Sequence, residues 1–80
     1  MVEPHYNSTE IAAYINVVSN IRYWEAVFID AEKSNDAFNT KNAAKYIKIG
    51  LKEYHQIVPE EIRKLVKINV SGLETLCSSV

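Results

Sequence analysis

The feature that most limits what this chain can fold into is a long stretch, residues 8–33, without proline or glycine. Apolar side chains recur along it mostly at steps of three and four residues, which is the helical period. They are Ile11, Tyr14, Ile15, Val18, Ile21 and Phe28. Asn7 and Glu10 stand three residues apart, the spacing of a capping box, which predicts a helix start at this point.

The middle of this stretch is less favourable to a helix than its ends. Residues 15–20 contain β-branched side chains, one serine and two asparagines, all of them modest helix formers. Two arrangements therefore fit residues 8–33: one long helix, or two helices joined by a turn near residues 16–20. We expect two helices.

The next segment divides into a loop and a basic helix. Residues 32–39 are rich in Ser, Asn and Asp, which favour turns, and Thr40 is a suitable cap for a helix over residues 40–58. An apolar stripe on that helix consists of Ala44, Ile47, Leu51, Tyr54 and Val58. A solvent-facing row on it consists of Lys41, Lys45, Lys48 and Lys52. Gly50 lowers helix propensity, so we expect a close packing contact there.

The C-terminal segment, residues 59–80, is expected to hold short helices. Pro59, followed by two acidic residues, is a good first helical position. Residues 67–70 fit either a last helical turn or a short extended piece. Ser71 and Glu74 have the spacing of a second capping box before a short final helix. The predicted fold class is mainly α, a single domain of four to five helices.

Composition narrows the class of protein. Eighty residues make one small domain, and 48% hydrophobic with 24% charged residues is typical of a globular chain. A single cysteine forms no internal disulfide. No apolar run is long enough to span a bilayer, and the N-terminus lacks the pattern of a signal peptide. We expect a cytoplasmic protein that does not bind membranes.

The sequence offers few residues suited to catalysis. His5 and His55 lie 50 positions apart, and neither has a metal-ligand spacing. Gly50 and Gly72 are the only glycines, so a glycine-rich phosphate loop is excluded. Cys77 has no neighbouring base in the sequence and is expected to fill space in the core. We expect no enzyme activity, no metal and no cofactor.

Charge is distributed unevenly along the chain. Residues 1–37 carry six acidic and two basic residues (−4), whereas residues 38–80 carry seven basic and four acidic residues (+3). The sum is the net charge of −1, which is unfavourable for a nucleic-acid-binding protein. The basic half can nevertheless form a contact face, or the two halves can simply be two solvated surfaces.

Residues 8–31 have the layout of a helix-turn-helix, with small alanines where two helices approach closely. Arg22 and Tyr23 then lie in the first half of the second helix, where they can reach phosphates or base edges. The run Arg22-Tyr23-Trp24-Glu25 resembles the recognition helix of the MerR family. Residues 60–65, Glu-Glu-Ile-Arg-Lys-Leu, are similar to a second motif of that family and follow in the expected order.

The resemblance implies a small winged-helix-like DNA-binding regulator or recombination accessory protein. The turn is about one residue short and the wing several residues short, so at most a vestigial wing is expected. There is no room for the long dimerisation helix of the family after residue 66. A relative of this kind would be minimal, like excisionase-type or phage regulators.

Two other interpretations remain open. Residues 38–50 are similar to the helix-turn-helix of small excisionases, and in that register the DNA-binding residues are Lys41, Lys45, Lys48 and Lys52. Alternatively, the aromatic residues form the core of a helical bundle and the lysine row is a solvated face. The protein is then a non-enzymatic protein-binding module, an adaptor or an inhibitor. Double-stranded DNA is the first expected partner and a protein the second, and a homodimer is compatible with either.

Overall fold

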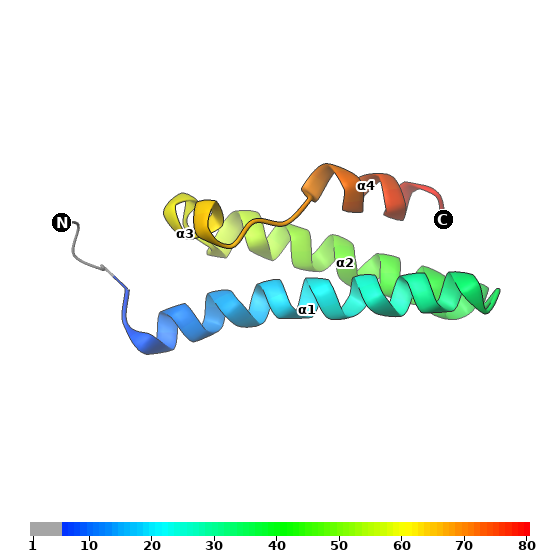
Figure 1. The fold of residues 1–80 in the computed structure, drawn as a ribbon, viewed down its shortest axis with the longest axis horizontal. Helices are drawn as coiled ribbons and strands as arrows, with labels where there is room; N and C mark the ends of the chain where they lie inside the picture. Colours follow the sequence, from blue (N-terminus) through cyan, green and yellow to red (C-terminus); the bar gives the residue numbers. More distant parts are fainter. Residues whose placement is uncertain (1–5) are drawn as a thin grey trace.

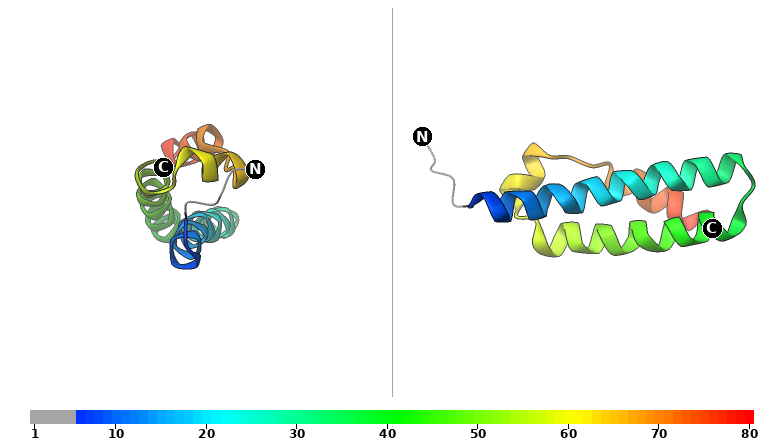
Figure 2. Two further views of the ribbon diagram at one scale, coloured as in Figure 1. Left: turned by 90° about the vertical axis from the view of Figure 1, so that its left-hand side faces the viewer. Right: turned by 90° about the horizontal axis from the view of Figure 1, so that it is seen from below.

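In the computed structural model, which describes residues 6–80, the chain forms four helices and no strand over that range. Helices α1 (Ser8–Lys33) and α2 (Ala37–Ile57) form a long antiparallel hairpin. Helices α3 (Glu60–Leu65) and α4 (Val70–Ser78) follow the end of α2 and lie on one side of the hairpin (Figures 1 and 2). The mainly α fold predicted from the sequence is confirmed.

Helix α1 is continuous, so the expected turn near residues 16–20 is wrong. The capping box at its start is confirmed, because Asn7 Oδ1 accepts from the Glu10 amide (2.8 Å) and Glu10 Oε1 accepts from the Asn7 amide (3.3 Å). In the middle of the helix Val18 and Ile21 are buried against α2. This burial outweighs weak local propensity, because tertiary packing supplies most helical stability in proteins. Residues 8–31 therefore contain no helix-turn-helix.

The connection between α1 and α2 is a turn of three residues, shorter than the loop expected over residues 32–39. Asn35 has a positive φ of 55°, a conformation that asparagine tolerates better than most residues. Asp36, not Thr40, caps α2, because its Oδ1 accepts from the Asn39 amide (3.1 Å). Thr40 is buried, and its hydroxyl donates to the Asp36 carbonyl (2.8 Å). A turn this short leaves no room for a wing.

The core lies mainly between α1 and α2. All five residues of the predicted α2 stripe, Ala44, Ile47, Leu51, Tyr54 and Val58, are buried. The close contact expected at Gly50 is confirmed, since a Cβ there would stand 2.6 Å from Ile21 Cγ1. Two of the predicted core residues of α1, Ile11 and Ile15, are instead exposed.

The C-terminal segment is attached to the hairpin by fewer contacts than those that join α1 to α2. The Tyr54 hydroxyl donates to the Val66 carbonyl (3.0 Å), which joins α2 to the end of α3. Pro59 is the N-cap of α3 and not its first helical residue. Asn69, not Ser71, caps α4, because its Oδ1 accepts from the Gly72 amide (3.0 Å). Residues 67–70 fitted either a helical turn or an extended piece: residues 67–69 are neither helix nor strand, and Val70 is the first residue of α4.

Candidate functional site: a lysine-lined groove

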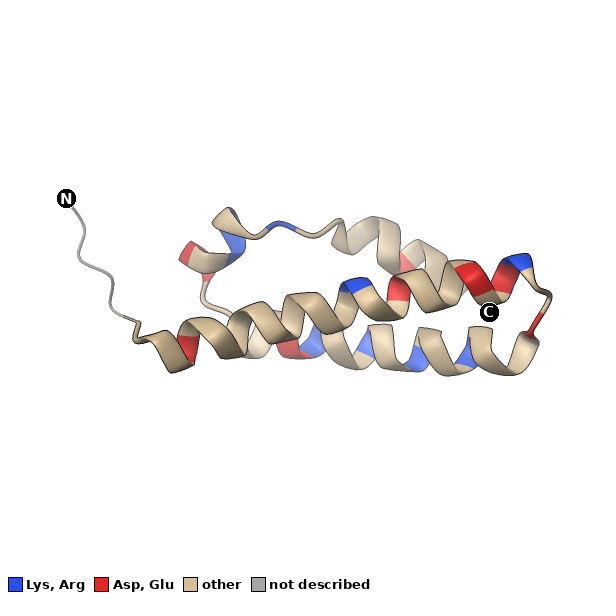
Figure 3. Cartoon of the chain, turned by 60° about the horizontal axis from the view of Figure 1, so that its bottom comes forward, with Lys and Arg blue, Asp and Glu red and all other residues tan. Residues whose placement is uncertain are grey.

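The four lysines of the predicted row are all exposed on α2. Lys41 and Lys52 are eleven residues apart, so the row extends about 16 Å along the helix at 1.5 Å per residue. Steps of three and four residues keep the row on one side of the helix. Figure 3 shows these positive residues following one another along α2. The row is thus a continuous positive edge on a straight helix.

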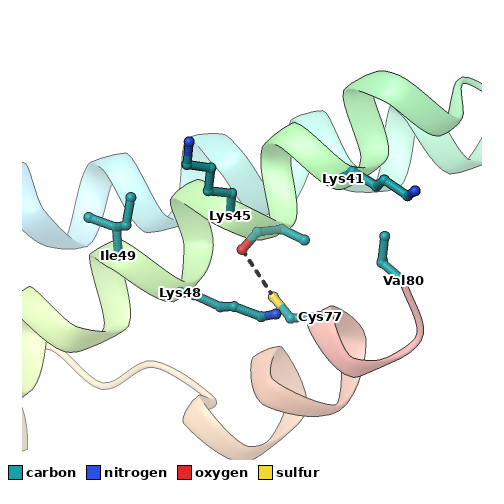
Figure 4. A pocket seen from close by; sticks show the side chains of 7 residues that line it. Lys41, Lys45, Lys48, Ile49, Cys77 and Val80 are labelled. Atoms are coloured by element: carbon teal, nitrogen blue, oxygen red, sulfur yellow. Dashed lines mark hydrogen bonds between the residues drawn. The ribbon is translucent and has the colours of Figure 1, made fainter.

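Beside this row, α2 and α4 enclose an open groove made of two hollows of about 440 Å³ each. Both hollows are lined by Lys48 and Cys77, so they adjoin one another. The apolar lining consists of Ala44, Ile49, Leu51, Val70, Cys77 and Val80. The polar lining consists of Lys41, Lys45, Lys48, Lys52, His55, Glu74 and Ser78. Figure 4 shows Lys41, Lys45 and Lys48 on α2, with Lys48 beside Cys77 and Lys41 beside Val80 of the C-terminal segment.

Cys77 contributes packing to this groove. Its side chain is 1% exposed, and its Sγ donates to the Ala44 carbonyl at 3.7 Å (Figure 4). Burial raises the pKa of the Cys77 thiol, and the nearby Lys48 ammonium opposes that rise in part. A thiol held in its neutral form is a poor nucleophile. The sequence-based expectation that Cys77 fills core space is confirmed.

Arg22 and Tyr23 are exposed near the middle of α1. Successive helical residues point about 100° apart, so the two side chains leave α1 in different directions. No α1 residue lines either hollow of the groove. The structure therefore does not combine these two residues with the lysine row into one site.

Trp24 is half-buried at the edge of the hairpin. Its ring stacks on Tyr46 of α2, with centroids 4.6 Å apart and planes at 18°. Tyr23 packs edge-on against Trp24, with centroids 5.1 Å apart. These contacts form an aromatic cluster that the sequence did not predict, because pairing of residues 24 and 46 depends on the register of the hairpin.

The groove also depends on residues that sequence reasoning missed. Val70 and Glu74 of α4 line one hollow, and Val80 lines the other. Nothing in the local pattern of residues 70–80 indicates which face meets α2. At the far end of the groove, Arg63 Nη1 donates to His55 Nδ1 (3.1 Å), which ties α3 to α2. His5 lies outside the described residues.

Two further observations concern other kinds of site. Within residues 6–80, no group of three or more His, Cys, Asp or Glu side chains is placed to hold a metal ion. None of the helices described is both long enough and apolar enough to cross a membrane. Comparison with protein-family models, with curated proteins and with solved structures yields no match.

Proposed function

We propose that this protein is a non-enzymatic binding module that holds an acidic, amphipathic segment of a partner protein in the groove between α2 and α4. The observation that carries this proposal is the pairing of an apolar lining with four exposed lysines along one edge. An amphipathic helix lays its apolar face into such a groove in a common mode of peptide recognition. Acidic side chains flanking that apolar face would meet the lysines.

The apolar lining favours a protein partner over DNA. Phosphate groups would pair with the lysines but would leave the accessible apolar surface of Ile49, Val70 and Val80 without a partner. Affinity for DNA grows with the number of phosphates neutralised, and four lysines on a chain of net charge −1 supply little of it. A segment that fills the groove gains both from burying apolar surface and from the charge contacts.

Double-stranded DNA is the second candidate, and the straight row of lysines along about 16 Å of α2 favours it. The MerR-like interpretation requires a separate recognition helix that carries Arg22 and Tyr23. Because α1 is one helix, a DNA-binding regulator would have to act through the lysine row alone. Binding of that kind would be weak, independent of sequence and steeply dependent on salt.

The test uses a fluorescent acidic amphipathic peptide of about 15 residues, with leucines on one helical face and glutamates beside them. We expect the double variant Lys45→Glu, Lys48→Glu to lose at least tenfold in affinity. The matched control is Lys64→Glu, Lys67→Glu, which makes the same charge change at exposed lysines outside the groove. Equal losses in the two variants would reduce the interaction to overall charge and would contradict the proposal.

A second arm separates the two partners. Ile49→Asp places a charge in the apolar lining without removing a lysine, and the side chain is exposed enough to be replaced without loss of fold. We expect this variant to lose peptide binding. Labelled random duplex DNA is titrated in parallel at about 50 and 200 mM salt, between which phosphate-led binding must weaken steeply. Strong DNA binding that Ile49→Asp leaves intact would favour the DNA-binding regulator.

A further inference from the structure

A second surface lies on the side of the hairpin that α3 and α4 do not cover. In the right-hand view of Figure 2, α1 and α2 lie side by side towards the viewer and α4 lies behind them. The stacked pair Trp24 and Tyr46 marks this open side, because Ala44, Lys48 and Leu51 on the other side of α2 line the groove with α4. We call the open side the aromatic face; its central residues, all exposed or half-buried, are Asn20, Trp24, Val27, Asn42 and Tyr46.

The aromatic face is almost uncharged. Helical position places one charged residue on it, Glu53 of α2, among residues 13–31 and 39–57. Glu53 is seven residues from Tyr46, about 10 Å along the helix from the stacked pair. By helical position, the other charged residues of these two stretches, including the lysine row, lie on other faces of α1 and α2. Interface cores are depleted of charge and enriched in Trp and Tyr in this way.

We propose that the aromatic face binds the same face of a second copy of this chain, so that two hairpins pack into a four-helix bundle. A two-fold interface presents the same patch on both subunits, so a charge near its centre tends to oppose its own copy. A neutral face avoids this penalty. The α1–α2 pair of one copy would pack against the α1–α2 pair of the other, as the two helix pairs of a four-helix bundle do.

The size of the face is sufficient for such an interface. Helix α2, with 21 residues, is about 30 Å long at 1.5 Å per residue. Two helices 8–10 Å apart present a layer about 20 Å wide. The product, about 600 Å² per copy, gives about 1,200 Å² in total, at the lower end of stable protein interfaces. Because the groove lies on the opposite side, the pair of copies would leave both grooves open.

The test is the mass of the full chain in solution, measured by sedimentation velocity between about 5 and 500 μM. We expect a dimer at the upper concentrations. Asn20→Glu puts a charge near the centre of the aromatic face and should raise the dimer dissociation constant at least tenfold. Ser19→Glu is the matched control, because Ser19 is the neighbouring exposed residue and points about 100° away.

Trp24 supplies an independent readout, since it is the only tryptophan in the chain and lies in the proposed interface. We expect its emission to shift to longer wavelength on dilution, over the same concentrations at which the mass falls, and Ser19→Glu to behave as the wild type does. A monomer throughout the concentration range would overturn the proposal. So would equal dissociation of the two variants, or a dimer in which dilution leaves the Trp24 emission unchanged. Circular dichroism of Asn20→Glu confirms that loss of the dimer is not loss of the fold.

Discussion

The α1–α2 hairpin and the α3–α4 segment differ in how they are held in place. The hairpin, with Val58 at the end of α2, has eleven buried apolar side chains, whereas α3 has no buried residue and α4 has two, Leu73 and Cys77. The α3–α4 segment also carries exposed apolar side chains, and the clearest case is Leu65, whose side chain is 81% exposed. Local opening free energy rises with buried apolar contact, so α4 should open before the hairpin does. The groove lies between the stable part of the molecule and the less stable part.

The largest effect is expected in the hairpin core. Phe28 is fully buried, and Phe28→Ala should cost about 3–5 kcal/mol through lost burial and the cavity left behind. A domain of this size has about 4–12 kcal/mol of total stability, so the variant should lose a large share of it and melt at least about 12 °C below the wild type. Thermal unfolding followed by circular dichroism at 222 nm measures this. A melting temperature within a few degrees of the wild type would show that the hairpin does not dominate stability.

The second prediction concerns α4 alone. Leu73→Ala should cost about 2–4 kcal/mol, but the loss should fall on the attachment of α4 while the hairpin stays helical. Release of α4 exposes the Cys77 thiol, so alkylation by iodoacetamide at pH 8 should accelerate at least tenfold. The helical signal should fall by little more than the share of α4. Simultaneous loss of the whole signal would mean that the two regions unfold as one unit.

A smaller effect is expected at the link between the regions. Tyr54→Phe removes the hydroxyl that donates to the Val66 carbonyl, a net loss of about 1 kcal/mol. Urea unfolding measures the loss of stability, and amide hydrogen exchange shows which part of the chain is destabilised. Exchange should quicken in α3 and in residues 66–69 and stay unchanged in α1. Faster exchange spread evenly over the chain would argue against a separately held C-terminal segment.

The smallest effect is the dependence of stability on pH through Cys77. Burial raises the pKa of the thiol, so below pH 8 both folded and unfolded states keep the proton and stability is constant. As the pH rises past the ordinary thiol value, the unfolded state releases its proton first and stability falls. With an ordinary thiol pKa of 9.0 in the unfolded state, the loss between pH 7 and 9 is at most about 0.4 kcal/mol. The Cys77→Ala variant should lack this slope, and an identical slope in both proteins would assign it to other groups.

Local signals allowed much of the hairpin to be predicted. The capping box at Asn7 and Glu10, the buried stripe of α2 and the contact at Gly50 each follow from spacing or residue type within one helix. The continuity of α1 did not follow, because residues 15–20 are poor helix formers in isolation. Burial of Val18 and Ile21 decides the outcome, and that burial requires α2.

The candidate site was predicted only in part, for the same reason. The lysine row could be predicted from its spacing, because exposure on one side of a helix needs no partner. The groove could not, since it exists only where α4 meets α2. The starts of α2 and α4 were misplaced because Thr40 and Ser71 are good caps by type, while Asp36 and Asn69 sit where the chain turns.

The elongation of the molecule affects how it will behave in a size-based separation. Its extents are 50 × 21 × 17 Å and its radius of gyration is 14.2 Å, whereas a typical chain of 80 residues has about 11.6 Å. A rod of this kind diffuses more slowly than a sphere of equal mass. On a gel-filtration column calibrated with globular standards, the single chain will therefore elute ahead of its 9.1 kDa. Its rotation in solution will also be anisotropic, slower about the short axes than about the long one.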